Sequence, residues 1–106
     1  LANHEEVAAA KAGVIGLTRS AAATYTRARI RFNCVAPGLV RTPLAAGLLS
    51  SDLAEKASVA MHPLGRIGEP EDIASAVCWF LDPKNSWLTG QVLGVDGGLA
   101  DIKAKS

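Results

Sequence analysis

The sequence has few aromatic residues, little net charge and no long apolar run, and each shortage removes a class of protein. Aromatic residues make up 5% of the 106 residues, so a core must be built mainly from aliphatic side chains. No apolar stretch reaches the ~20 residues that cross a membrane, and no signal peptide is visible. A formal net charge of +1 provides no strong field for nucleic acid or for an anionic membrane. We therefore expect neither partner.

Cysteine is also scarce. Cys34 and Cys78 each stand in an apolar run, which predicts two buried thiols rather than a disulfide or a metal site. Reduced thiols fit a cytoplasmic protein.

A chain of this length holds one domain at most, and folding would bury roughly two-thirds of its surface. Its 49% hydrophobic and 20% charged residues are typical of a globular domain. Because the sequence begins with Leu1 rather than Met, we expect a processed product or a part of a longer polypeptide.

The first predicted element is one long helix over residues 7–27, which are rich in alanine. Asn3 and Glu6 have the spacing of a capping box at its start. Gly13 and Gly16 lie on one face of this helix, so we expect another backbone to approach closely there.

A short strand follows at residues 30–35 (IRFNCV), which are β-rich and end at Pro37-Gly38. Residues 44–60 then have helical spacing, either as a mobile flap or as a pair of surface helices. Five apolar side chains share one predicted stripe in this segment: Leu44, Leu48, Leu49, Leu53 and Ala57.

Another helix opens at residues 69–72 (EPED), since proline and acidic residues favour a first turn. Its apolar face, which contains Ile73, Val77, Phe80 and Leu81, ends at Asp82-Pro83. Residues 91–95 (QVLGV) predict a final strand, closed by residues 96–98 (DGG), and residues 100–106 form a polar, frayed tail.

The order of elements is long helix, strand, helical loop region, helix, strand. A helix between two strands is typical of an α/β layer, but two strands are too few to form a stable sheet alone. The sequence therefore predicts the C-terminal half of a Rossmann-type, doubly wound parallel sheet, as a single partial domain over residues 1–106.

Four segments carry a resemblance to a known family, and they stand in the family's order and spacing. They are residues 8–14 (AAAKAGV), 30–43 (IRFNCVAPGLVRTP), 63–74 (PLGRIGEPEDIA) and 88–98 (LTGQVLGVDGG). Together they resemble the C-terminal part of the short-chain dehydrogenase/reductase family, closest in type to 3-oxoacyl-(acyl-carrier-protein) reductases. The resemblance implies oxidoreductases that use NAD or NADP to interconvert a carbonyl and an alcohol.

The family's catalytic helix reads Tyr-x-x-x-Lys, and only half of this pair is present. Lys11 matches the lysine, which binds the nicotinamide ribose and lowers the tyrosine pKa in the family. Val7 stands at the tyrosine position and cannot exchange a proton. Tyr25 lies several turns further along the helix and cannot substitute for it.

The family's glycine-rich phosphate loop and its catalytic serine precede the tyrosine position, so these 106 residues do not contain them. What the resemblance leaves is the nicotinamide end of the cofactor site. Pro37 and Gly38 would shape the turn, backbone groups at Val40 would bind the carboxamide, and Thr42 would contact the carboxamide or the phosphates. We expect the chain alone to bind no cofactor, with these residues shaping a loop.

Three functions remain open. Under the first hypothesis the chain is a reductase fragment, inactive alone or paired with a complementary N-terminal half. Under the second it is a self-associating module, a homo-oligomeric dimer or tetramer, because the elements present build the subunit interfaces in the family. Under the third it has a new activity such as hydrolysis, with His4 beside Glu5 or Glu6, and His62, as the candidate catalytic residues. For His4, Glu5 and Glu6, however, we expect the role of a solvated helix cap.

Overall fold

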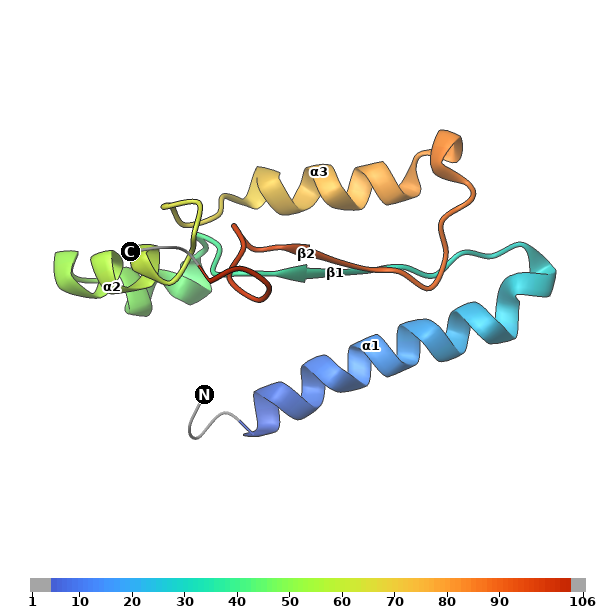
Figure 1. The fold of residues 1–106 in the computed structure, drawn as a ribbon, viewed down its shortest axis with the longest axis horizontal. Helices are drawn as coiled ribbons and strands as arrows, with labels where there is room; N and C mark the ends of the chain where they lie inside the picture. Colours follow the sequence, from blue (N-terminus) through green and yellow to red (C-terminus); the bar gives the residue numbers. More distant parts are fainter. Residues whose placement is uncertain (1–4, 104–106) are drawn as a thin grey trace. The chain divides into compact units, whose positions relative to one another are not determined.

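The computed structural model describes residues 5–103, and the chain divides into two compact units. One holds the described residues up to Cys34 together with Phe80–Leu93, and the other holds Val35–Trp79 with the described residues from Gly94 onward. The elements follow the predicted order: helix, strand, helical region, helix, strand (Figure 1). The α/β class predicted from the sequence is confirmed.

The long helix is α1 (Glu5–Tyr25), followed by one 3-10 turn, η1 (Thr26–Ala28). Its predicted existence is confirmed, but the proposed cap at Asn3 lies outside the described residues. Few of its side chains are covered, and only Thr18 and Ala22 are buried. Among residues 5–103, no atom outside the local helix backbone would touch a β-carbon added at Gly13 or Gly16, so these residues do not make the close approach expected there.

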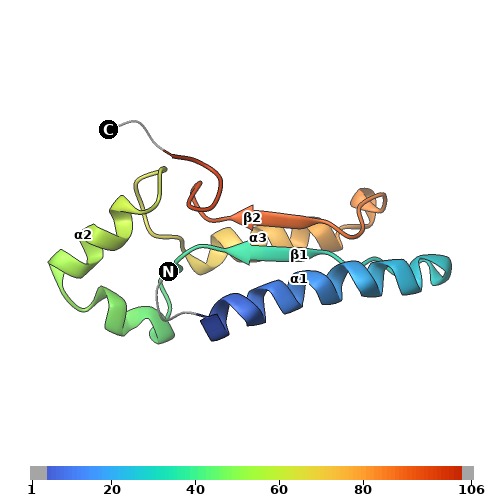
Figure 2. The same cartoon turned by 60° about the horizontal axis from the view of Figure 1, so that its bottom comes forward.

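The two strands are β1 (Cys34–Pro37) and β2 (Val92–Val95), which pair side by side in one parallel sheet (Figure 2). The second strand begins one residue later than predicted and ends where predicted, but the first begins four residues later than predicted. Before Cys34 the backbone does not form a regular ladder. Asn33 instead binds through its side chain, donating from Nδ2 to the Leu88 carbonyl at 3.0 Å and accepting the Gln91 N–H at 3.1 Å.

The helical region forms η2 (Pro43–Leu49) and α2 (Asp52–Ala60), so of the two predicted forms the structure has a helix pair. The break is at Ser51, whose hydroxyl accepts the Ala54 N–H at 3.1 Å and caps α2. Because the axis breaks there, the single apolar stripe predicted across both halves is wrong. Leu44 is 96% exposed and Leu53 is 81% exposed.

Helix α3 (Pro70–Leu81) begins at its proline and ends before Asp82, as predicted, and the 3-10 turn η3 (Pro83–Asn85) follows. Of its predicted apolar face only Phe80 is buried. Cys78 is exposed, so the prediction of two buried thiols holds for Cys34 alone. The reason is rotation around the helix: Cys78 lies about 200° from Phe80 at 100° per residue.

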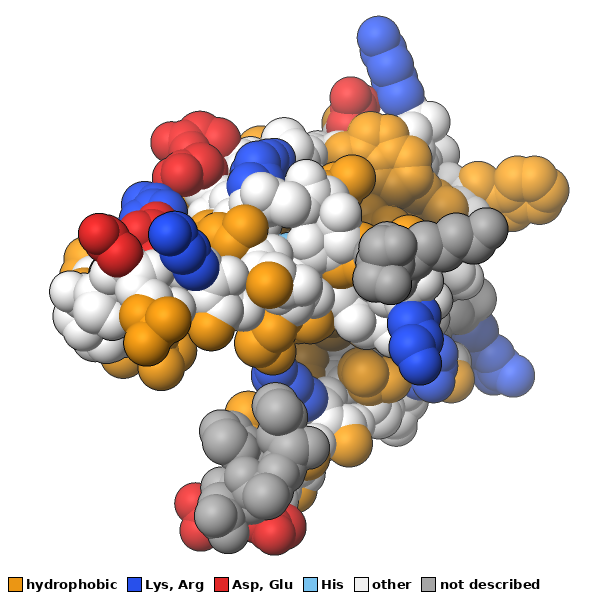
Figure 3. All heavy atoms as spheres, turned by 60° about the vertical axis from the view of Figure 1, so that its left-hand side comes forward, with side chains coloured by type: hydrophobic (Ala, Val, Ile, Leu, Met, Phe, Trp, Pro, Cys, Tyr) orange, Lys and Arg blue, Asp and Glu red, His pale blue; other side chains and the backbone are white. Residues whose placement is uncertain are grey.

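The described residues bury few side chains and leave many apolar ones exposed. In the unit with α1 the buried residues are Thr18, Ala22, Cys34 and Phe80, and in the other unit they are Ala45, His62 and Ile67. Hydrophobic side chains appear at several separate places on the face shown in Figure 3. None of the helices that the structure describes has the length and apolar character that crossing a bilayer requires.

Candidate functional site

The predicted cofactor residues Pro37, Gly38, Val40 and Thr42 form one continuous stretch that leaves the end of β1. Gly38 continues the strand pairing, because its N–H donates to the Val95 carbonyl at 3.1 Å. A β-carbon at Gly38 would lie 2.9 Å from Asp96 Cβ and 3.0 Å from both Asp96 Cα and His62 Nε2. Glycine is therefore required here by close packing, which fixes where the loop of residues 38–42 begins.

Val40 has the backbone geometry that the family resemblance asks for. It forms a parallel bridge with Gly68, in which the Gly68 N–H donates to the Leu39 carbonyl at 2.9 Å and the Arg41 N–H to the Gly68 carbonyl at 2.8 Å. In such a bridge the N–H and carbonyl of the central residue point to the opposite side. Within residues 5–103 no hydrogen bond uses the Val40 N–H or carbonyl. A donor and an acceptor thus stand side by side there, as a carboxamide requires.

Thr42 is half-buried and begins η2. Its hydroxyl oxygen accepts the Ala45 N–H at 3.3 Å, which leaves the hydroxyl proton to donate to an acceptor outside the described residues. The oxygens of a carboxamide or a phosphate are acceptors of that kind, so Thr42 fits the role that the resemblance implies.

Arg41 ties this loop to two acidic side chains. Its guanidinium lies 2.5 Å from Glu55 Oε1 on α2 and 3.6 Å from Glu69 Oε1. Hydrogen bonding and charge attraction from Glu55, with a smaller contribution from Glu69, raise the pKa of Arg41 above its usual value. The pairs are solvent-exposed, so they orient the loop more than they stabilise the fold.

Lys11 and Val7 lie on α1, which belongs to the other unit. They are one helical turn apart and both are exposed, so the face that would carry the catalytic pair carries Lys11 alone. Tyr25 ends α1 and packs against Phe32, with ring centroids 5.6 Å apart. The expectation that Tyr25 does not occupy the missing position agrees with this placement.

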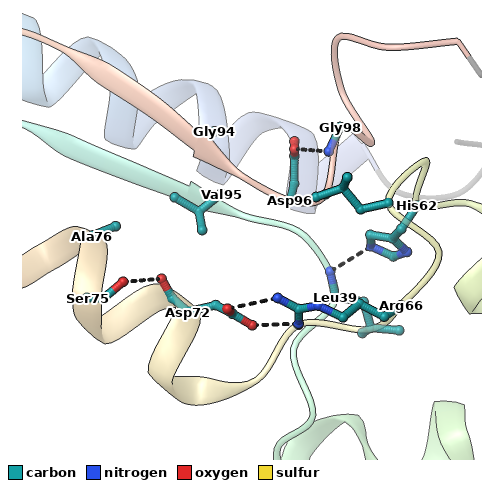
Figure 4. Close-up of a pocket in the computed structure, with 13 residues that line it drawn as sticks. Leu39, His62, Arg66, Asp72, Ser75, Ala76, Gly94, Val95, Asp96 and Gly98 are labelled. Atoms are coloured by element: carbon teal, nitrogen blue, oxygen red, sulfur yellow. Dashed lines mark hydrogen bonds and ion pairs between the residues drawn. The ribbon is translucent and has the colours of Figure 1, made fainter.

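A pocket of about 480 Å³ lies beside the same loop, but Val40 and Thr42 do not line it (Figure 4). The close-up shows its polar groups paired with one another or with the backbone. The Arg66 guanidinium makes two hydrogen bonds to Asp72, at 2.8 and 3.0 Å. Asp96 accepts the N–H of Gly98 at 2.9 Å and that of Ala100 at 3.2 Å. We therefore assign the polar residues that line this pocket a structural role, which is to support the loop of residues 38–42.

His62 lines this pocket and was a candidate base for hydrolysis. It is 4% exposed, and both ring nitrogens meet backbone groups: Nδ1 lies 2.7 Å from the Ser58 carbonyl and Nε2 lies 3.2 Å from the Leu39 nitrogen. A base must have a nitrogen available to a substrate, and neither of these is. The other candidate, His4, lies outside the described residues. Among residues 5–103 no group of three or more His, Cys, Asp or Glu side chains could hold a metal ion.

Sequence reasoning missed the supporting roles of Arg41, His62 and Asp96. Arg41 meets Glu55 fourteen positions later, and His62 meets Leu39 across 23 positions, so no local pattern connects them. Asp96 had a usable signal, because aspartate before Gly-Gly often accepts backbone N–H groups in a turn.

Asp72 gives a testable pH dependence. Hydrogen bonds from Arg66 and from the Glu69 N–H lower its pKa from 3.8 to about 2. A lowered folded-state pKa contributes stability that is fully present above the unfolded value, about 4, and is lost as the pH falls through about 2. We expect the urea midpoint to fall between pH 4 and pH 2, and to fall less in Asp72→Asn. Asp101→Asn is the matched control, and an equal pH response in both variants would contradict the assignment.

Comparison with known proteins gives independent evidence on the family to which the chain belongs. A protein-family model described as enoyl-(acyl carrier protein) reductase matches residues 1–100. Cis-4-hydroxycyclohexanecarboxylate dehydrogenase of Sinomonas cyclohexanicum is 47% identical over 101 residues, which are 95% of this chain and 40% of that protein. The 3-oxoacyl-(acyl-carrier-protein) reductase FabG of Thermotoga maritima is 42% identical over 92 residues, which are 87% of this chain and 37% of that protein.

Among solved structures, that of a 4-hydroxyisoleucine dehydrogenase mutant complexed with NADH and succinate matches with a TM-score of 0.83 and 29% identity. The match covers 91% of this chain and 40% of that one. The chain thus spans about 40% of the length of the relatives that it resembles.

Proposed function

The chain belongs to the short-chain dehydrogenase/reductase family, and on this premise we propose that its residues 38–42 hold the nicotinamide end of NAD or NADP in an oxidoreductase that interconverts a carbonyl and an alcohol. The observation that supports this best is the backbone of Val40, whose N–H and carbonyl are unused within residues 5–103 and lie side by side. The nicotinamide, when bound, supplies or accepts the hydride.

Each residue has a limited role in this proposal. The Val40 N–H donates to the carboxamide oxygen, and the Val40 carbonyl accepts from the carboxamide nitrogen. The Thr42 hydroxyl donates to the carboxamide or to a phosphate oxygen. Lys11, by its match to the family lysine, binds the nicotinamide ribose.

The proton transfer of the family reaction has no donor at position 7. Valine has no titratable group, so Lys11 has no phenol whose pKa it could lower. We infer that the 106 residues alone do not perform reduction. The phosphate-binding loop and the serine, if the protein has them, come from outside these residues.

A cofactor titration tests the proposal. In place of the sequence-based expectation that the chain alone binds no cofactor, we expect the purified chain to bind NADH and reduced nicotinamide mononucleotide with similar, weak affinity, and AMP not at all, because only the nicotinamide end is held. Chemical-shift changes in NMR spectra should centre on Val40 and Thr42. Thr42→Val should weaken binding about 5- to 10-fold through the loss of one hydrogen bond, whereas Thr24→Val, at an exposed site on α1, should not.

Two results would count against it. Micromolar NADH binding that AMP displaces would show that the chain also holds the adenosine end. Shift changes that avoid residues 38–42 would place the nicotinamide elsewhere. As a further control, Val7→Tyr should not produce reductase turnover, since the added phenol would lack the rest of the site.

The exposed apolar residues favour a second candidate, a self-associating module. Val14 and Leu17 on α1 are more than half exposed, and the positions of Gly13 and Gly16 are open. Exposed apolar area of this kind favours association with another chain, here a second copy in a homodimer or homotetramer. Sedimentation of the same sample separates the two: a stable oligomer at micromolar concentration without nicotinamide binding supports the module, and a monomer opposes it. A cytoplasmic location fits both, because neither cysteine is in a disulfide.

A further inference from the structure

His62 connects two segments that lie far apart in the sequence. One ring nitrogen meets the Ser58 carbonyl in the last turn of α2, and the other meets the N–H of Leu39 in the loop of residues 38–42. The Leu39 N–H is a donor, so Nε2 must accept from it. The proton of the neutral ring therefore sits on Nδ1, which donates to Ser58 at 2.7 Å.

The ring has little room to turn. It is 4% exposed, and its Nε2 atom lies 3.0 Å from the place that a β-carbon on Gly38 would take. On its other side, His62 Cβ lies 3.6 Å from the corresponding point at Gly97. The turn at Gly97 is itself anchored, because its carbonyl accepts the Leu64 N–H at 2.9 Å. Both hydrogen bonds of His62 are thus held in one geometry, as Figure 4 shows for the bond to Leu39.

Leu39 directly precedes Val40, whose backbone carries the proposed carboxamide contact. The Leu39 N–H lies in the peptide unit directly before the one that carries the Val40 N–H, and the two planar units join at the Leu39 Cα. Fixing the first unit therefore restricts the orientations open to the second. Helix α2 reaches the same loop a second time through Glu55 and Arg41, at the exposed surface. The connection through His62 is buried and uncharged, so salt does not screen it.

We propose that His62 is a positioning residue that couples the C-terminal end of α2 to the loop of residues 38–42. When α2 is formed, its Ser58 carbonyl fixes the ring, and the ring fixes the Leu39 N–H. When the end of α2 frays, the ring loses its anchor and the loop loosens. The effect on cofactor binding rests on the proposed function, whereas the coupling itself does not.

Two substitutions in the full chain separate the two bonds. His62→Gln can place its amide oxygen near the position of Nε2 and still accept from Leu39. His62→Asn can place an amide nitrogen near the position of Nδ1, donates to Ser58, and has nothing to offer Leu39. We expect hydrogen exchange at the Leu39 amide to rise about tenfold in His62→Asn and to change no more than about threefold in His62→Gln.

A third substitution tests the coupling from the helix side. Ser51→Ala removes the cap of α2 without touching His62, so it should raise Leu39 exchange in the wild-type chain. In the His62→Asn background it should add little, because the connection is already cut. Ser86→Ala, an exposed serine beyond α3, is the matched control and should leave Leu39 unchanged.

Three results would overturn the proposal: equal Leu39 exchange in the Gln and Asn variants, an equal effect of Ser51→Ala in both backgrounds, or a wild-type ring that NMR nitrogen shifts show protonated on Nε2. The last measurement decides the matter even if His62→Asn does not fold. NADH titration of the same variants is read separately. If the wild-type chain binds no NADH, the proposed function fails while the exchange data still decide the role of His62.

Discussion

Gly38→Ala is expected to destabilise the protein by about 2 kcal/mol, because the added methyl group would clash with Asp96. Its β-carbon would lie 2.9 Å from Asp96 Cβ and 3.0 Å from Asp96 Cα. Those atoms belong to or adjoin the backbone after β2, and the carboxylate of Asp96 accepts two N–H groups. Asp96 therefore cannot move aside without losing hydrogen bonds. The measurement is the urea midpoint followed by circular dichroism.

Gly47→Ala provides the matched control for this prediction. Gly47 lies in η2, in the same unit, and nothing in the described chain comes within 4 Å of the added methyl group. Its midpoint should stay unchanged or rise slightly, since alanine restricts the unfolded chain more than glycine does. Equal losses in both variants would mean that packing against Asp96 is not the reason for glycine at position 38.

Phe80→Ala has the largest expected effect, a loss of about 3–5 kcal/mol. Phe80 is 7% exposed and is the largest of the four buried side chains in its unit, the others being Thr18, Ala22 and Cys34. Because so few side chains in this unit are buried, removing the largest of them takes away much of its buried apolar area. The loss is comparable to the lower end of the ~5–15 kcal/mol that stabilise a domain, so we expect the variant to be largely unfolded at 37 °C.

The control for Phe80 is Trp87→Ala in the same unit. Trp87 is an even larger aromatic residue but is 100% exposed, so its removal should change stability by less than about 0.5 kcal/mol. Phe80→Leu should lose about 1 kcal/mol, because most of the volume remains. A Phe80→Ala variant with native thermal unfolding would show that the buried cluster does not hold this unit together.

The sequence predicted the helices better than the first strand, and the reason is physical. A helix such as α3 closes its hydrogen bonds within itself, so Pro70 and Asp82 mark its ends directly. A strand needs a partner. Residues 30–33 have strand-like composition, but the segment opposite them turns at Gly90, where φ is +71°, and there the ladder gives way to side-chain bonds from Asn33.

The candidate site was likewise predictable only in part. Residues 38–42 form one continuous motif and were found by resemblance. Its support comes from His62 and Asp96, which reach the loop from distant parts of the sequence and carry no periodic signal. Lys11, a predicted site residue, and Val7, which stands at the tyrosine position, are where the helix pattern placed them, because positions four apart on α1 share a face.

The Val40 bridge has a consequence for how the protein can change over generations. In the proposed function, recognition there is made by peptide atoms, which are the same whatever side chain residue 40 carries. Almost any replacement would therefore preserve it. Only proline, which has no N–H, or an insertion or deletion that moves the neighbouring peptides out of phase with Gly68, would erase it. Under the proposed function, a valine in place of the catalytic tyrosine would therefore leave the contacts to the nicotinamide unchanged.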